Sequence, residues 1–219
     1  MAKKRKTIIK ILAYGFLILW VLFSLVPLTT MLITALKPAN TFMKYPPDYF
    51  SLKLTGENFK VVLSDSRWIK YYLDTIWIAL SASAISVFVG SLAAYSFARH
   101  NFKMKKFFMI FILALQMIPA ASIVIPLYNM FAVMNLLDTY LVVILVDSVG
   151  TMPLVIWLMQ GYFATIPKEL EEAGYIDGCS NLQSFWKITF PLAAPGIAAS
   201  AIFSFVRSFN DYIIAKTLA

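Results

Sequence analysis

Long uncharged apolar runs are the feature that most limits how this chain can fold. The run from Ile11 to Leu36 contains no charged residue and follows a basic N-terminal stretch, residues 1–10. About 20 apolar residues are enough for a helix to cross a hydrocarbon core of about 30 Å. A secretory signal peptide has a shorter apolar core and a small-residue cleavage site. The run therefore predicts a transmembrane helix.

Further apolar runs extend this prediction to the whole chain. The sequence is 60% hydrophobic and only 14% charged, which excludes an ordinary soluble domain. Within lipid every backbone polar group must be paired internally, and helices achieve this. The fold class is therefore predicted to be all-α, a polytopic transmembrane helical bundle. Its predicted spans are 11–36, 72–98, 107–128, 139–163, and a fifth that begins near Pro195 and continues through Arg207, Asn210 and Asp211.

The basic residues lie in short segments between these spans. Cytoplasmic loops usually carry an excess of Lys and Arg. The predicted inside segments hold five, four and two of them, against six and none outside. The segments compared are 1–10, 99–106 and 164–193 inside, and 37–70 and 129–138 outside. The near balance comes from one long loop, where the rule is weaker, so a cytoplasmic N-terminus is predicted. The net charge of +8 is attributed to topology and anionic lipid contact, not to nucleic acid.

Residue usage argues against chemistry carried by the chain itself. Cys179 is the single cysteine and His100 the single histidine. That leaves no internal disulfide and no cysteine or histidine metal cluster. A Walker-type phosphate loop is not found. We therefore expect no catalytic residue, no metal and no cofactor, and a protein that is not an enzyme.

Two local patterns predict details of the first half. Pro46 and Pro47 oppose helix in the long loop, and residues 57–63 can form a short surface helix. The small residues of Ser81–Ala84 and Gly90–Ala94 allow helices to pack closely in a membrane.

A polar, helix-prone segment from Ile166 to Pro195 stands between the fourth and fifth predicted spans. Pro167 can open a helix at its first position. Gly178 is a natural stop for that helix. A second short helix is expected from Asn181 to about Thr189. Acids in the first turn of the first helix favour the positive end of its dipole, and these are Glu169, Glu171 and Glu172.

The residues Glu172-Ala173-Gly174, then Gly178, then Ile188-Thr189-Phe190-Pro191 carry a family resemblance. They resemble the EAA loop of the membrane subunits of bacterial ABC importers, Glu-Ala-Ala, three residues, Gly, nine residues, Ile-x-Leu-Pro. Gly174 replaces the second Ala and Phe190 replaces Leu. The resemblance implies a cytoplasmic coupling helix that docks on an ATPase. The alternative is an amphipathic interfacial loop that touches lipid headgroups.

The coupling loop, residues 164–193, implies a role for each of its marked residues. Its acids are expected to face the partner, and Glu172 is the position whose family counterpart contacts the ATPase. Asp177 is expected to cap the second helix or the turn. Ile188 and Pro191 are expected to pack the loop and to stop its second helix. The complete implied set is Glu171, Glu172, Ala173, Gly174, Asp177, Gly178, Ile188 and Pro191.

Ionisable groups inside spans are candidates for a translocation path. From the rise of a helix per residue, Asp147 is expected at a depth of roughly 13 Å from one side of the membrane and Arg207 at roughly 18 Å from the other. We therefore expect these two side chains to face each other or a shared water-filled cavity. An intrahelical pair between Arg207 and Asp211, spaced i, i+4, is the alternative.

Other path candidates come from resemblance to carbohydrate permeases. Gln116-Met117-Ile118-Pro119 and Ile125-Pro126-Leu127-Tyr128 resemble their paired proline motifs. A kink is the expected effect, and a gating hinge is the alternative. Gln116 is expected either to bridge two helices or to bind a polyhydroxylated substrate. Phe209-Asn210-Asp211-Tyr212 resembles their Trp-Asn-acid-aromatic sequence, with Phe209 in place of Trp.

Together the motifs resemble one permease subunit of a binding-protein-dependent sugar ABC importer of the maltose or multiple-sugar type. The resemblance implies that residues 1–219 form a single transmembrane domain in a bacterial inner membrane, with a sixth span expected beyond Ala219. It implies as partners a second permease, cytoplasmic ATPase subunits, an extracytoplasmic solute-binding protein, a sugar and the lipid bilayer. The alternatives are a peptide or amino-acid permease, an ion-coupled secondary transporter using Asp147 and Asp211, and a membrane scaffold without transport.

Overall fold

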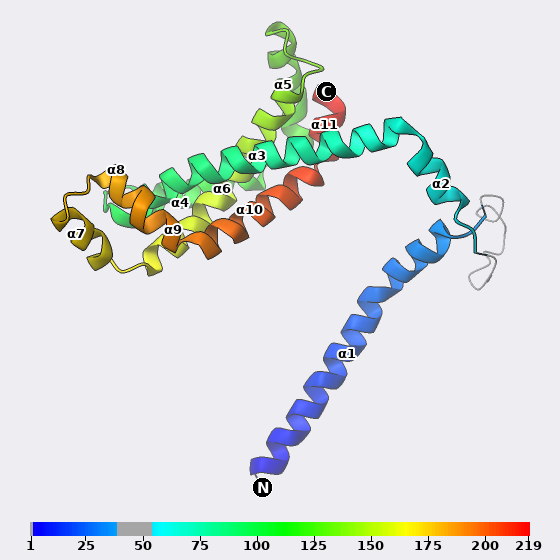
Figure 1. The fold of residues 1–219 in the computed structure, drawn as a ribbon, viewed down its shortest axis with the longest axis horizontal. Coiled ribbons are helices and arrows are strands. Elements are labelled where there is room, and N and C mark those ends of the chain that lie inside the picture. Colours follow the sequence, from blue (N-terminus) through cyan, green and yellow to red (C-terminus); the bar gives the residue numbers. More distant parts are fainter. Residues whose placement is uncertain (1, 39–53) are drawn as a thin grey trace. The chain divides into compact units, whose positions relative to one another are not determined.

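The computed structural model describes residues 2–38 and 54–219, and these form helices and no strand (Figure 1). This confirms the predicted all-α fold. The positions of Pro46 and Pro47 lie outside the described residues. The helices are α1 Ala2–Ala35, α2 Glu57–Ser64, α3 Ser66–Arg99, α4 Lys105–Ala114, η2 Leu115–Met117, α5 Ala120–Val133, α6 Tyr140–Thr165, α7 Glu169–Ile176, α8 Asn181–Ser184, η3 Phe185–Thr189, α9 Phe190–Leu192, α10 Ala194–Phe209 and α11 Tyr212–Leu218.

The chain divides into two compact units, Met1–Tyr71 and Tyr72–Ala219. In the first unit, α2 confirms the short helix predicted in the long loop. The Asn58 side-chain amide donates to the backbone oxygens of Ala35, at 2.9 Å, and Lys37, at 2.7 Å. These two bonds fix the start of α2 to the end of α1. The single-domain organisation of residues 1–219 stays a prediction.

Among the described residues, three single helices are long and apolar enough to cross a membrane, at Ile9–Ala35, Ser66–Arg99 and Tyr140–Thr165. Two further candidates are bent pairs, Lys105–Met117 with Ala120–Val133 and Asn181–Leu192 with Ala194–Phe209. Counting each bent pair as one span gives up to five, the number that the sequence predicts. Asp147, Gly150 and Pro153 lie within one continuous helix, α6.

The third predicted span is more strongly bent than a kinked helix. Its two parts meet at an angle of 90°. Ile118 has extended backbone, φ −77° and ψ 118°, because the ring of Pro119 disfavours helix at the residue before it. Pro126, by contrast, lies inside α5 without ending it. Only the first of the two proline motifs therefore breaks the helix.

The fifth predicted span also differs from the expectation. It is preceded by the helical stretch Asn181–Leu192 and bends by 77° before α10. α10 ends at Phe209, so the prediction of a helix continuing through Asn210 and Asp211 is wrong. The Asp211 carboxylate instead accepts the backbone N–H of Ile214 at 3.0 Å and caps α11.

Small and hydroxylated residues bring α3, α6 and α10 together in the second unit. Residues of both predicted small-residue stretches are buried, namely Ala82, Ser83, Gly90, Ser91 and Ala94. A Cβ at Gly90 would lie 2.8 Å from Cγ1 of Val155, so α3 and α6 touch where a side chain would not fit. Ser83 Oγ donates to the backbone oxygen of Ala201 at 3.0 Å, which joins α3 to α10. The predicted close packing is confirmed.

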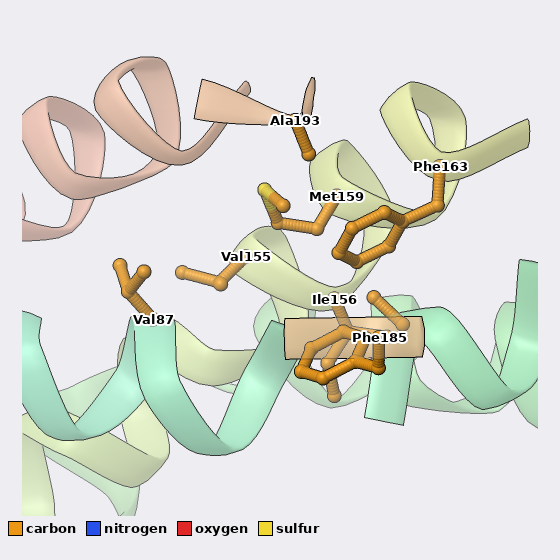
Figure 2. Packing of buried hydrophobic residues seen from close by; sticks show 8 residues of the cluster. Val87, Val155, Ile156, Met159, Phe163, Phe185 and Ala193 are labelled. Atoms are coloured by element: carbon orange, nitrogen blue, oxygen red, sulfur yellow. The ribbon is translucent and has the colours of Figure 1, made fainter. Parts of the chain in front are cut away.

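A hydrophobic cluster lies where α3 and α6 approach the α7–α9 segment. Figure 2 shows buried side chains from α3, α6, η3 and the bend at Ala193 gathered in one place. Phe185 is 2% exposed and its ring centroid lies 4.8 Å from that of Tyr95. It therefore anchors the start of η3 in the core of the second unit.

α7 and α8 lie at one end of the second unit together with Arg99 at the end of α3, as an ion pair between Arg99 and Glu171 shows (Figure 1). α11 lies at the other end, where the backbone N–H of Asp138 donates to the oxygen of Leu218 at 2.9 Å. Within the second unit, the segments 99–106 and 164–193, predicted to be inside, thus lie apart from the segment 129–138, predicted to be outside.

Candidate functional site

Gly178 ends α7 in a left-handed turn. Its φ is +87°, a conformation that favours glycine. The N–H of Cys179 donates to the oxygen of Gly174 at 2.9 Å, and the N–H of Gly178 donates to that of Tyr175 at 3.1 Å. This pair of bonds is a Schellman motif, which satisfies the last carbonyls of a helix. The predicted glycine stop is confirmed.

Ser180 caps the helix that follows the turn. Its hydroxyl accepts the N–H of Gln183 at 3.3 Å, and the Gln183 side chain accepts the N–H of Ser180 at 2.9 Å. This reciprocal capping box fixes where α8 begins. Of the two roles predicted for Asp177, capping the second helix is wrong, because Ser180 caps α8. Asp177 lies at the C-cap of α7, where the turn begins.

Helix α7 is packed tightly against the segment that follows α8. Gly174 is buried, and a Cβ there would collide with Cδ1 of Ile188. Ile188 belongs to η3, a π-helical turn that lies between α8 and α9. Pro191 lies one residue before the end of this helical stretch at Leu192. The packing role predicted for Ile188 is confirmed.

Glu171 is the most deeply buried charged residue of the loop. It is 4% exposed. Its Oε1 accepts hydrogen bonds from Arg99 Nε and from the Thr189 hydroxyl, each at 2.7 Å, and its Oε2 accepts one from the Tyr95 hydroxyl at 2.8 Å. Arg99 Nη2 also lies 2.7 Å from Oε1. One carboxylate therefore joins α7 to both α3 and η3.

The surroundings of Glu171 keep it charged. Burial alone would raise its pKa, because it disfavours the ionised form. The hydrogen bonds from Thr189, Arg99 and Tyr95, with the positive charge of Arg99, outweigh burial and lower the pKa of Glu171 below its usual value. Glu171 is thus a fixed negative charge at neutral pH.

The outward face of the loop combines acids with exposed apolar side chains. Glu169 and Glu172 are exposed, as the prediction that acids face a partner requires, but that prediction is wrong for Glu171. Ile176 is 87% exposed and Leu182 64%. Ala173 and Pro191 are exposed as well. Exposed apolar groups beside charges are typical of surfaces that bind a partner.

A cavity of about 420 Å³ lies between the bent α4–α5 pair, α6 and the end of α10. Most of its lining is apolar, as is usual for small-molecule sites. Four of the predicted path residues line it, namely Gln116, Asp147, Arg207 and Asp211. The fifth, Asn210, lines a smaller neighbouring cavity of about 210 Å³ together with Asp147 and Asp211. The structure therefore brings all five predicted residues to one region.

The charged side chains that line the cavity do not form a simple ion pair with one another. The Ser208 hydroxyl donates to Oδ2 of Asp147, whose side chain is buried. Among residues 2–38 and 54–219, no ion pair joins Arg207 to Asp147 or Asp211. Asp147 and Arg207 share one cavity, as one of the two predicted arrangements requires. The alternative of an intrahelical pair between Arg207 and Asp211 is wrong, because α10 ends between them. The amide nitrogen of Gln116 is buried and has no hydrogen-bond partner.

Several residues that build the site were not predicted from the sequence. Tyr95, Arg99 and Thr189 hold Glu171, and Ser208 holds Asp147. The position of Arg99 could have indicated its role. A basic residue that directly follows an apolar span needs a partner of opposite charge when it is buried. Elsewhere in the described part of the chain, no group of three or more His, Cys, Asp or Glu could hold a metal ion.

Comparison with known proteins places the chain in a family. The family model described as binding-protein-dependent transport system inner membrane component matches residues 86–219. The chain belongs to this family. Its matched relatives include the maltodextrin transport system permease protein MdxG of Bacillus subtilis, which is 34% identical over 213 residues, covering 95% of this chain and 74% of that protein. Another is the maltodextrin transport system permease protein MalD of Streptococcus pneumoniae, 31% identical over 216 residues, covering 99% and 76%.

A solved structure shares the fold. A bacterial ABC transporter involved in the import of the acidic polysaccharide alginate matches with a TM-score of 0.79 over 97% of this chain and 74% of that one. Its sequence is 22% identical, so the likeness concerns the fold alone. Family and spans together identify a multi-pass membrane protein of the transport class. The family resemblance predicted from the loop motif is confirmed.

Proposed function

We propose that this chain is one permease subunit of an ATP-driven sugar importer. The observation that carries this proposal is the loop α7–Gly178–α8, whose outer face is acidic and apolar while its inner face is bonded to α3. Membership of a family of binding-protein-dependent transport components supports an importer, and the maltodextrin permeases among the relatives support a sugar. The remaining subunits are a second permease, two cytoplasmic ATPase subunits and an extracytoplasmic solute-binding protein.

Within this importer, residues 164–193 form the contact with the ATPase. Glu172 contributes charge that can pair with basic residues of the partner, and Ile176 and Leu182 contribute apolar area. An exposed helix that enters a groove is a common mode of recognition between proteins. In this orientation the N-terminus and the loop are cytoplasmic, and the chain performs no covalent chemistry.

The cavity forms part of the sugar path. Its apolar walls and few polar groups suit a polyhydroxylated molecule that stacks on hydrocarbon and forms hydrogen bonds at fixed points. Gln116, Arg207 and Asp211 line the cavity and supply hydrogen-bond donors and acceptors for sugar hydroxyls.

Labelling of Cys179 tests the proposal directly. Cys179 is the single cysteine and is partly exposed in the turn. A membrane-impermeant maleimide should modify it only from the cytoplasmic face of oriented vesicles, and addition of the ATPase subunit should block the reaction. Labelling from the outside would reject the topology. Cytoplasmic labelling that the ATPase does not block would reject the docking role.

Two variants serve as controls for this test. Val133→Cys in a Cys179→Ser background places the reporter on the exposed C-terminal end of α5, at the opposite end of the unit. It should react only from the outside, with or without the ATPase. Ile176→Asp puts a charge on the proposed contact and should reduce protection of Cys179 without changing the face from which it reacts.

A further inference from the structure

The charges at the base of the loop do more than anchor it. Glu171 and Glu172 are adjacent in α7, yet Glu172 is exposed whereas Glu171 is 4% exposed and bonded only to residues of this chain. A docking partner therefore has no access to Glu171. Its role must be sought in what it connects.

The carboxylate connects three elements. Arg99 and Tyr95 reach it from the end of α3, and Thr189 reaches it from the π-helical turn η3. Beyond η3 the chain continues through α9 into α10, which carries Arg207 at the cavity. A movement of α7 therefore acts through Glu171 on two separate elements, α3 and the η3–α10 segment.

The α3 route also reaches the cavity. Ser86 of α3 lies 2.6 Å from the hydroxyl of Thr151, and Thr151 lines the cavity. Ser204 of α10 donates to the same hydroxyl at 3.0 Å. The two routes that leave Glu171 therefore meet again at Thr151.

We propose that Glu171 and Arg99 form the rigid joint that passes movement of the docked loop to the cavity. Separating two buried charges is costly because each is left unpaired in a poorly solvated site. Arg99 Nη2 lies 2.7 Å from the Glu171 carboxylate and forms no hydrogen bond to any other group in the described part of the chain, so nothing else nearby replaces the carboxylate. α7 and the end of α3 consequently move as one body. Glu171 is a positioning residue, and this role rests on the proposed ATPase coupling.

The test measures coupling without needing the identity of the sugar. Val149 lines the cavity and is 67% exposed, so Val149→Cys in a Cys179→Ser background reports on the cavity. The full chain is assembled with its partner permease and ATPase subunits in nanodiscs. The maleimide labelling rate is measured with and without ATP and vanadate. ATP should change this rate by about 5-fold or more, the low end of coupling between sites.

Glu171→Gln should remove this ATP-dependent change while the ATPase stays bound and continues to hydrolyse ATP. Glu57→Gln, which removes an exposed carboxylate from α2, should retain the full change. Glu172→Gln should instead reduce the amount of ATPase bound. A full ATP response in Glu171→Gln overturns the joint. No ATP response in the unsubstituted reporter chain overturns the proposed function instead, which keeps the two failures distinct.

Two milder variants decide the case in which Glu171→Gln does not assemble. Thr189→Val and Tyr95→Phe each remove one hydrogen bond to the carboxylate and leave both charges in place. Each should lower the ATP-dependent change by at least half with the ATPase still bound. Assembled variants with an unchanged response overturn the proposal.

Discussion

Replacing Thr151 by Val should loosen the contact between α3, α6 and α10. Thr151 is 2% exposed, and its hydroxyl meets Ser86 at 2.6 Å and Ser204 at 3.0 Å. Val has nearly the same shape, so the substitution removes the hydroxyl with little change of volume. Hydrogen bonds between membrane helices average about 0.6 kcal/mol, so losing two of them should cost about 1.2 kcal/mol.

The two partners of Thr151 are affected differently. Ser86 retains a bond of 2.6 Å to the backbone oxygen of Ser148. Ser204, which is 1% exposed, would keep no hydrogen-bond partner in the described part of the chain. An unpaired buried hydroxyl adds a cost, so removing it with Ser204→Ala should recover part of the loss.

The assay is unfolding in mixed micelles of increasing SDS content, with the free energy of unfolding compared at one SDS fraction. Thr151→Ser is the matched control, because it keeps the hydroxyl and loses only a methyl group. In the cycle with Ser204→Ala, the double variant should lie about 0.6 kcal/mol closer to the wild type than the sum of the single variants. A Thr151→Val cost no larger than that of Thr151→Ser, or strict additivity with Ser204→Ala, would refute the reasoning.

Three further predictions concern the loop. Gly174→Ala should destabilise the assembled protein by about 1 kcal/mol because its Cβ meets Cδ1 of Ile188, and Ile188→Val should restore thermal stability by removing that atom. Gly178→Ala should cost about 1 kcal/mol because of the φ of +87°, and a smaller loss for Gly178→Asn in the same melting experiment would identify the backbone as the cause. The pKa of Glu171 is lowered, so the attachment of α7 should be constant above the usual carboxyl value of 4.5 and weaken as the pH falls below it. Hydrogen exchange of α7 against pH tests this, and an identical acid profile in Glu171→Gln would contradict it.

Local signals in the sequence predicted much of the framework. Apolar runs located the three single helices and the two bent pairs, because about 20 apolar residues in a helix span the hydrocarbon core with their backbone groups paired. Gly178 predicted its turn because the left-handed conformation suits glycine. The buried Ser and Gly residues of α3 were predicted from their size alone. Each of these predictions depends on a residue type and its immediate neighbours.

The remaining features depend on contacts between distant residues. Glu171 and Glu172 are the same residue type in the same turn, and contacts with residues distant in the sequence, Arg99 and Tyr95 above all, distinguish them. Pro119 predicted a distortion, but not its size: the two parts of this span meet at 90°, with α4 against α6 and α5 against α11. The end of α10 at Phe209 has no glycine or proline to mark it. The sequence predicted a shared cavity because it placed Asp147 and Arg207 at similar depth in the membrane. It did not predict the hydrogen bond between Asp147 and Ser208.

The opposite exposures of Glu171 and Glu172 make helix register a matter of function in this loop. An α-helix turns by about 100° per residue, so neighbouring side chains cannot serve the same neighbour. Deleting Leu170 would carry Glu171 out of its buried site and bring Glu172 in, even though the number of acids stayed the same. When related chains are aligned, the acid that pairs with the arginine ending α3 is therefore a better reference point than the first acid of the run.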